Sequence, residues 1–223
     1  MSWPSVAAST LAVVSIALGV ACGNGSEKPP RQITKDDLSM MVLQREDVPA
    51  ELNLLEEDRK DRGIVEPLYN PPGTLMFLRE FERPPHQAES GTVVCIMNSA
   101  VLYETTDEAR RVFRQGQDLQ KLYQKELGLS GTELPWSEIH SSSLASLGDD
   151  RQALRLVSTG TDFCSSYRDE PAEAYFLVAI RYNVAMGLLV WTYQEGASLD
   201  EAVKLAEKQA SRIDALFEGD DSP

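Results

Sequence analysis

The last third of the sequence holds the pattern that most restricts the fold. Two apolar runs, residues 174–180 and 184–193, are separated only by Arg181, Tyr182 and Asn183. A short polar break between two apolar runs predicts a β-hairpin, and Asn183 is the residue in it best suited to a positive φ. An antiparallel sheet is therefore the framework that the other segments must fit.

Other segments predict further strands. Residues 74–83 and 92–103 are rich in apolar side chains. The second run is uncharged until its end, as in a central strand covered on both faces or a strand bent across the core. Residues 152–158 alternate between apolar and polar side chains, which predicts a strand with one solvated face. A connection that contains a short strand or turn fits residues 130–150.

Amphipathic helices are predicted to pack on this sheet. The first begins at Thr34, which forms a capping pattern with Asp37, and stops before Pro49, because the residue before a proline avoids the helical region. A capping box at Thr105 opens a second helix that ends at Gly128, and another at Ser198 opens the last helix. The basic residues of the second helix point largely away from its apolar stripe. They form either a solvated face or a patch that binds an acidic partner. These residues are Arg110, Arg111, Arg114, Lys121 and Lys125.

These elements predict an α+β fold, a largely antiparallel sheet of about five or six strands packed by long amphipathic helices in an α/β sandwich. The domain organisation follows from composition. Residues 1–21 are predicted to be a signal peptide, 22–33 a flexible tether, 34–218 a single globular domain and 219–223 an acidic tail.

The amino terminus predicts export. Residues 6–21 carry no charge and are followed by a polar stretch, the order found in secretion signals, and the run is shorter than the roughly 20 apolar residues of a membrane span. With Cys22 directly after Ala21, the segment resembles a bacterial lipoprotein signal. That resemblance implies cleavage before Cys22, lipid on its sulfur and a location on the outer face of the bacterial cell membrane. The segment departs from the pattern at Gly19, where such signals carry leucine, and it has no Lys or Arg before the apolar run. An uncleaved anchor is the alternative.

The cysteines agree with an oxidising compartment. If Cys22 carries lipid, Cys95 and Cys164 remain as an even pair. Each lies in or beside a predicted strand, so the sequence allows a disulfide between them. Two buried free thiols are the alternative.

Charge excludes some classes of partner. The chain has 35 acidic and 21 basic residues and a formal net charge of −14. Nucleic acids and anionic membrane surfaces bind clustered Lys and Arg, so we expect no nucleic-acid partner. Membrane contact is expected through lipid on Cys22, and a protein or a small ligand is the expected binding partner.

The sequence contains no known catalytic, metal-binding or cofactor-binding motif. His86 and His140, the 2 histidines, fit neither a zinc-ligand spacing nor a metalloprotease motif. No nucleophile elbow or Gly-rich phosphate loop occurs. A cell-envelope hydrolase would need Glu138, His140, Asp149 and Asp150 to converge in one pocket.

We therefore expect a non-catalytic, membrane-anchored extracytoplasmic domain that acts as a binding, sensor or interaction module. Its contacts are expected from loops at the sheet ends, residues 58–73 and 159–171. A carrier of a hydrophobic ligand is a further alternative, in which Phe77, Trp191 and Tyr193 line a cavity.

The order of elements over residues 34–217 resembles that of exported bacterial lipoproteins of the PsbP-like group. It is also similar to extracytoplasmic sensor domains of bacterial receptor kinases. The resemblance rests on element order and on the final hairpin and helix. It implies an α/β/α sandwich outside the cytoplasm and transfers no functional residue.

Overall fold

The computed structural model describes most of the predicted domain, and every described residue belongs to one compact unit that starts at Arg31. Among the helices of these residues, none is both long and apolar enough to cross a membrane. The described residues are 33–57, 74–115, 136–159 without Asp149, Tyr167, and 171–218 without Glu195 and Ala197. The predicted signal peptide and acidic tail, and the tether up to residue 32, lie outside them.

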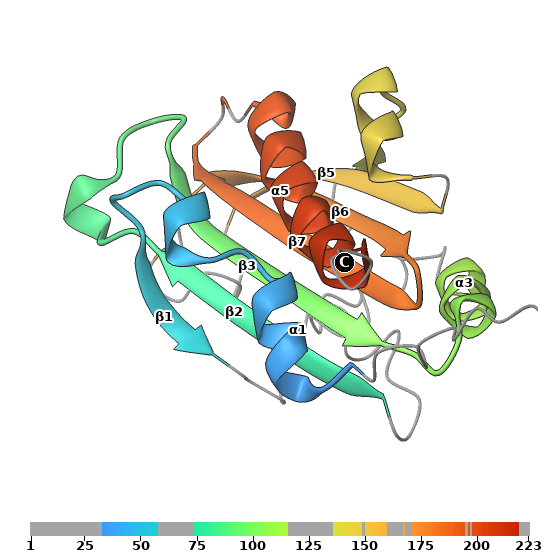
Figure 1. Ribbon diagram of the computed structural model, residues 1–223. Helices are drawn as coiled ribbons and strands as arrows, with labels where there is room; N and C mark the ends of the chain where they lie inside the picture. The colour runs from blue at the N-terminus through green and yellow to red at the C-terminus, as the bar shows by residue number, and fades with distance from the viewer. Residues whose placement is uncertain are drawn as a thin grey trace, which may run out of the picture. The chain divides into compact units, whose positions relative to one another are not determined.

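A fully antiparallel, seven-stranded sheet forms the centre of the structure (Figure 1). Its spatial order is β1-β2-β3-β7-β6-β5-β4, so two meanders meet along the pair β3 and β7. The predicted α+β fold class is confirmed. The strands are β1 (Asn53–Glu57), β2 (Leu75–Glu82), β3 (Val93–Leu102), β4 (Trp136–Glu138), β5 (Arg151–Thr159), β6 (Pro171–Arg181) and β7 (Val184–Tyr193).

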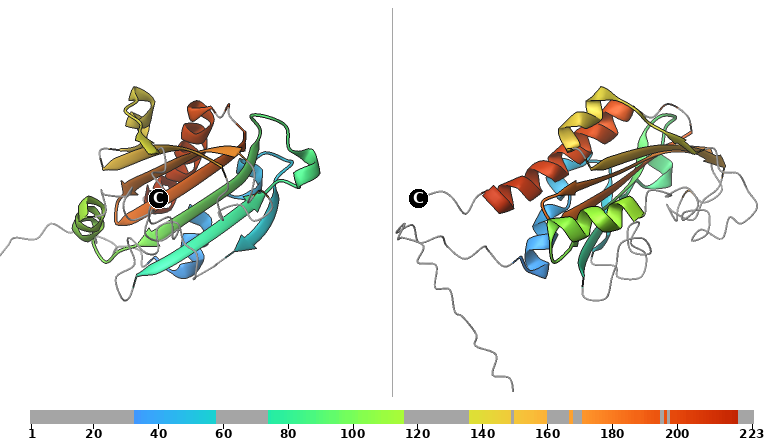
Figure 2. Two further views of the ribbon diagram at one scale, coloured as in Figure 1. Left: turned by 180° about the vertical axis from the view of Figure 1, so that it is seen from behind. Right: turned by 90° about the vertical axis from the view of Figure 1, so that its right-hand side faces the viewer.

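Helices pack on both faces of this sheet. α1 (Lys35–Met41) and α5 (Leu199–Glu218) lie on one face, and α3 (Thr106–Gln115) lies against the other (Figure 2). The predicted capping box of Thr34 and Asp37 opens α1. At α3, Thr105 accepts a hydrogen bond from the N–H of Glu108, while the Glu108 carboxylate accepts one from the N–H of Glu104. Residues of the second predicted helix beyond Gln115 lie outside the described part of the chain. Short 3₁₀ turns occupy three connections: η1 (Arg45–Asp47), η2 (Pro85–Gln87) and η3 (Ser142–Leu147).

Each face of the sheet has its own hydrophobic core. Leu188 and Leu189 are consecutive on β7, yet Leu188 packs toward α1 and α5 while Leu189 packs toward α3. This arrangement explains why β3 and β7 are apolar along almost their whole length, since successive side chains of a strand point to opposite faces.

One buried amide fixes α1 on the sheet. Asn98 of β3 is fully buried, and its Oδ1 accepts a hydrogen bond from the backbone N–H of Leu43 at 2.7 Å. Its Nδ2 donates to the carbonyl oxygen of Arg79 at 3.0 Å, and Arg79 Nη1 donates to the carbonyl oxygen of Leu43 at 2.9 Å. The three residues thus satisfy one another's buried polar groups.

The first helix is shorter than the sequence predicts. It ends at Met41 instead of continuing up to the Val48-Pro49 pair, and the separate turn η1 follows. The N–H of Leu43 is taken by Asn98, and the Gln44 side chain donates to two carbonyl oxygens at the end of the helix, at 2.8 Å each. These bonds replace the next turn of helical bonds.

The turn of the β6–β7 hairpin also corrects a prediction. Tyr182, not Asn183, has the positive φ, at 55°. Asn183 donates its Nδ2 to the carbonyl oxygen of Tyr103 at 2.6 Å and so ties the turn to the end of β3. The Tyr182 ring stacks on Phe217 with centroids 4.4 Å apart, and its hydroxyl bonds Glu218 at 3.0 Å. These contacts with α5 offset the cost of an unfavourable backbone conformation.

One strand of the sheet, β1, is not predicted by the sequence pattern. Its five side chains have the pattern exposed, exposed, exposed, half-buried, exposed, because β1 pairs with β2 alone at the edge of the sheet. The short strand predicted within residues 130–150 is β4.

Replacing Asn98 with leucine should destabilise the fold by about 2–4 kcal/mol, because the Leu43 N–H and the Arg79 carbonyl lose buried partners and each such loss costs about 1–3 kcal/mol. Urea unfolding followed by circular dichroism measures the change. The exposed substitution Gln115→Leu is the control and should change the free energy of unfolding by less than about 0.5 kcal/mol. Equal stability of Asn98→Leu and the wild type would contradict the assigned role.

Candidate functional site

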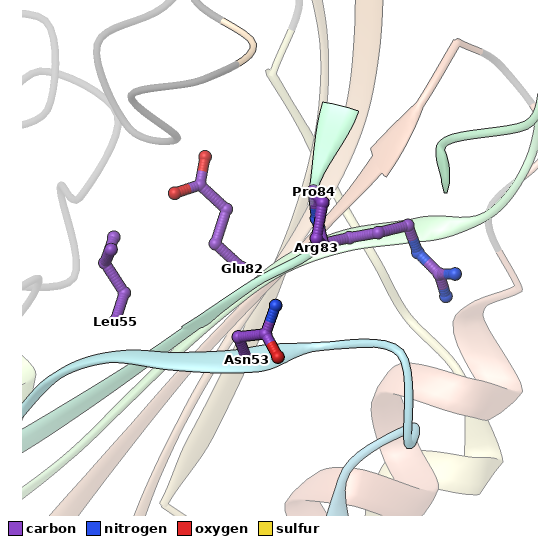
Figure 3. Close-up of a pocket in the computed structure, with 5 residues that line it drawn as sticks. All are labelled: Asn53, Leu55, Glu82, Arg83 and Pro84. Carbon is purple, nitrogen blue, oxygen red and sulfur yellow. The ribbon is translucent and has the colours of Figure 1, made fainter. Parts of the chain in front are cut away.

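A small open pocket lies at the edge of the sheet, where β2 ends and β1 begins (Figure 3). Its volume is about 170 Å³. Pockets for drug-sized ligands hold roughly 300–1,000 Å³, so this one suits a single side chain or a small chemical group. It is lined by Asn53, Leu55, Glu82, Arg83 and Pro84.

Two interruptions of the strand ladder create this space. Pro84 has no N–H to donate and lies two residues after the end of β2, and the next residue starts η2. On β1 the register with β2 shifts between Leu54 and Glu56, an irregularity typical of a β-bulge. Leu55 therefore has no partner residue on β2, and its side chain is 52% exposed.

The two charged residues of the pocket are oriented differently. The Arg83 guanidinium points away from Glu82 (Figure 3), with Nε donating to the carbonyl oxygen of Val93 at 2.9 Å and Nη2 3.7 Å from the Glu51 carboxylate. Glu82 is only 7% exposed, and its side chain extends to the same side of the sheet as that of Leu55 (Figure 3).

Tyr167 lies next to this pocket. Its hydroxyl donates to the carbonyl oxygen of Arg83 at 2.9 Å, and its ring packs against Tyr193 with centroids 6.0 Å apart. Burial raises the pKa of the Tyr167 phenol, and the negative charge of Glu82 raises it further. The segment 159–171, predicted to make contacts, thus places its described tyrosine beside the pocket.

The two predicted contact segments begin from opposite ends of the sheet. Leu75, the first residue of β2 after segment 58–73, lies at the end where β7 begins. Thr159 and Pro171, which flank the other segment, pair with each other at the opposite end. Most of both segments lies outside the described residues, so their contacts stay a prediction.

A second buried carboxylate stabilises the connection into α5. Glu173 of β6 is 2% exposed, and its Oε1 accepts hydrogen bonds from Arg155 Nε and from the Tyr175 hydroxyl, the latter at 3.0 Å. Its Oε2 accepts from the N–H of Gly196 at 3.2 Å, where φ is 124° and a side chain would be strained. Burial raises the pKa of Glu173, but the bonds from Arg155, Gly196 and Tyr175 outweigh it and hold that pKa below its usual value.

The residues of the hydrolase hypothesis do not converge on one described site. Glu138 and His140 lie 3.9 Å apart on the surface, with both side chains largely exposed. Asp150 instead bonds Arg110 of α3 at 2.7 Å. Asp149 lies outside the described residues. Asp150 also pairs with Arg114 of α3, at 3.4 Å, and neither Asp150 nor Glu138 and His140 are among the residues that line the pocket described above.

The aromatic residues of the carrier hypothesis are also separated. Phe77 belongs to the core beneath α1 and α5, whereas Trp191 and Tyr193 pack in or against the core on the opposite face. These three residues therefore do not line a common cavity.

The basic face of α3 is exposed and partly paired. Arg110 and Arg114 lie 2.7 and 3.4 Å from Asp150, and Arg111 lies 3.6 Å from Glu108. Lys121 and Lys125, which the sequence analysis placed on the same basic face, lie beyond the described end of α3. The described arginines form a solvated face with internal ion pairs.

Cys95 is fully buried and forms a disulfide with a cysteine outside the described residues. Cys22 and Cys164 both lie outside that part of the chain, so lipid attachment at Cys22 and the pairing of Cys95 with Cys164 stay predictions. Within the described ranges, no group of three or more His, Cys, Asp or Glu side chains is placed to hold a metal ion.

The residues that line the pocket are not among the site residues predicted from the sequence. The available signal was the charged pair Glu82 and Arg83 directly before two prolines, because a strand that ends at Pro-Pro leaves its last side chains at the rim of a sheet. The contribution of Asn53 and Leu55 depends on the pairing of β1 with β2, which the sequence pattern does not reveal.

No protein-family model and no curated protein matches this chain. Among solved structures, the extracellular domain of PknH from Mycobacterium tuberculosis is similar to it, with 13% sequence identity and a TM-score of 0.54 over 83% of this chain and 99% of that chain. A point mutant of the protein Mog1 matches at 12% identity over 77% and 82% of the two chains, with a TM-score of 0.32 that supports no structural argument. The first match shows a fold shared with an extracellular domain, and at this identity it transfers no site.

Glu173→Gln should destabilise the protein most at neutral pH and progressively less in acid. Because the folded-state pKa of Glu173 is below its usual value near 4.5, its stabilising contribution is complete above that pH and is lost as the pH falls through the folded-state pKa. Urea unfolding of both proteins between pH 7 and pH 3 measures the difference, with the exposed substitution Glu89→Gln as the control. A difference that stays constant down to pH 3 would show that the ionised carboxylate is not the stabilising form.

Proposed function

We propose that this chain is a lipid-anchored, extracytoplasmic binding module without catalytic activity. The observation that carries the proposal is its fold, which matches an extracellular domain over 83% of the chain. The export signal predicted at the amino terminus supports the same location.

Lipid on Cys22 would connect the domain to the membrane by the predicted tether, residues 22–33. Even fully extended, twelve residues span at most about 40 Å. The domain would therefore work close to the membrane surface, where partners are other surface proteins or molecules that diffuse to the cell.

The chemistry of the pocket supports binding. Its described lining offers a carboxylate, an amide, a guanidinium and two apolar side chains, and none of these is an imidazole or a hydroxyl or thiol nucleophile. Such polar side chains can form hydrogen bonds with a small polar group of a ligand. Of the residues proposed for a hydrolase, the described ones lie away from this pocket, where Glu138 and His140 approach each other and Asp150 pairs with arginines of α3.

We also propose that Cys95 pairs with Cys164. Tyr167 follows Cys164 by three residues, and its hydroxyl is bonded to Arg83. Cys95 pairs with Glu82, the residue before Arg83, across the β2–β3 ladder. Three residues span up to about 10 Å, so the position of Tyr167 supports a Cys164 within reach of Cys95.

Replacing Cys22 with serine should move the protein from the membrane fraction to the soluble fraction of its host, because serine does not accept the lipid. Ser26→Ala, in the same tether, is the matched control and should remain with the membranes. The intact wild type should give a mature mass that starts at Cys22 and includes a diacylglyceryl group. Membrane retention of Cys22→Ser would show that the apolar segment itself is the anchor.

Peptide mapping of the non-reduced protein should recover Cys95 and Cys164 in one cross-linked fragment. Reduction should then lower the unfolding midpoint, because closing a loop of about 70 residues contributes roughly 4 kcal/mol in the chain-entropy model. Cys164→Ala should unfold like the reduced protein. Recovery of Cys95 cross-linked to Cys22, or of free thiols at both positions, would refute the pairing.

A further inference from the structure

We propose that the Cys95 disulfide forms while the chain is still incompletely folded, by exchange with a disulfide-bearing oxidant, and that the folded protein keeps it out of reach of other thiols. The order of these steps depends neither on lipid at Cys22 nor on which cysteine pairs with Cys95.

The first support is the position of Cys95. It lies in β3, which is paired on both sides, and its exposed fraction is 0%. Its partner residues in the two ladders are Glu82 of β2 and Trp191 of β7. Trp191 is 1% exposed and packs with Cys95 in the core on the α3 face of the sheet. A thiol of another molecule therefore cannot reach the Cys95 sulfur unless this core opens.

The second support is the chemistry of thiol exchange. The attacking thiolate bonds to one sulfur of a disulfide while the other sulfur leaves as a thiolate, so the rate depends on access to the first sulfur and on the stability of the second. Burial prevents attack on Cys95 itself. Attack on the sulfur of its partner would release Cys95 as a thiolate inside an apolar core, where a charge is costly. Burial of Cys95 thus slows both routes.

The third support is the charge of the neighbouring residues. Reactive cysteines lie beside a cation or at the N-terminus of a helix, which stabilise the thiolate. Neither ladder partner of Cys95 provides a cation, because Glu82 is acidic and Trp191 is aromatic. Arg83, the basic residue next to Glu82, is held elsewhere, with Nε donating to the carbonyl oxygen of Val93 at 2.9 Å and Nη2 lying 3.7 Å from the Glu51 carboxylate.

The same limits apply to formation of the disulfide. One cysteine attacks the disulfide of the oxidant and displaces one of its sulfurs, and the other cysteine then attacks the mixed disulfide and displaces the second. Two thiols of the chain become one disulfide, and the two electrons and two protons leave with the oxidant as its two thiols. Whether Cys95 reacts first or second, it must react as a solvated thiolate.

The position of Trp191 in the sequence gives the chain time for this reaction. Trp191 belongs to β7, the last strand of the described sheet in chain order, so Cys95 stays uncovered on that side until residues 184–193 pair with β3. The reaction that this chain requires is therefore thiol oxidation before β7 closes on β3. The finished disulfide then acts as a permanent cross-link and does not respond to reductants outside the folded protein.

The first test is reduction of the mature, full-length protein in mild detergent by excess dithiothreitol, stopped at intervals with iodoacetamide. Peptide mapping by mass spectrometry then measures the alkylated fraction of Cys95. We expect Cys95 to become reactive at least about tenfold more slowly in native buffer than in urea above the unfolding midpoint. Oxidised glutathione in the same tube is the control for the reductant and should be fully reduced under both conditions.

A variant far from the sulfur tests whether opening of the fold limits the reaction. Asn98→Leu is expected to destabilise the protein from the other face of β3, so it should speed reduction of Cys95 in native buffer at least about tenfold. Gln115→Leu, the exposed control, should leave the rate unchanged.

The order of oxidation and folding is tested by refolding the reduced, urea-unfolded protein. Oxidised glutathione is added either at the start of refolding or after the circular dichroism spectrum has returned, and we expect late addition to oxidise Cys95 at least about tenfold more slowly. A reduced chain that never regains the spectrum would show that oxidation precedes folding, as proposed.

Four results would overturn the proposal. They are a free Cys95 thiol in the mature protein, reduction in native buffer as fast as in urea, an unchanged reduction rate in a destabilised Asn98→Leu, and equal oxidation rates before and after folding. Membrane fractionation of Cys22→Ser tests the proposed function separately, so these results leave the anchored location unaffected.

Discussion

The placement of the edge strand depends on a chain of buried polar contacts that begins at Asn98. Its amide holds the Arg79 carbonyl and the Leu43 N–H, and the Arg79 guanidinium holds the Leu43 carbonyl and, through Nε, the Glu57 carboxylate of β1. Buried polar groups without partners are costly, so these bonds leave α1, β2, β3 and β1 a single relative arrangement. The pocket beside β1 therefore has its geometry fixed from the middle of the sheet, by residues that do not line it.

Much of the fold follows from local sequence, because its main elements carry strong local signals. The long apolar runs at β3, β6 and β7 and the capping boxes at Thr34 and Thr105 predict those elements without reference to the rest of the chain. The errors have long-range causes. The end of α1 depends on Asn98, 55 residues beyond Leu43, and the positive φ of Tyr182 is accepted because its ring stacks on Phe217. Neither contact is visible in a local pattern.

The site was harder to predict than the fold for a related reason. Leu55 and Glu82 are ordinary residues of a short charged segment and of a strand end, and only the register between β1 and β2 brings them to one pocket. Residues that looked chemical in the sequence, such as His140, lie instead on the exposed surface. Composition is informative at a coarser level, because the excess of acidic residues predicts that the chain does not bind nucleic acids, which need clustered Lys and Arg.

The seam between β3 and β7 has a consequence for how the chain is made. Val93 must pair with Thr192 and Leu102 with Val184, so the first meander has no neighbour along its inner edge until residues 184–193 have been synthesised. Pairing across such distances is slow, and an unpaired apolar edge attracts other chains in the interval. A protein of this topology that leaves the cytoplasm unfolded emerges from the membrane with β3 uncovered and β7 still inside. The folding of such an exported protein cannot finish until β7 has also left the membrane. That part of the chain is the one whose sequence carries the strongest structural signal.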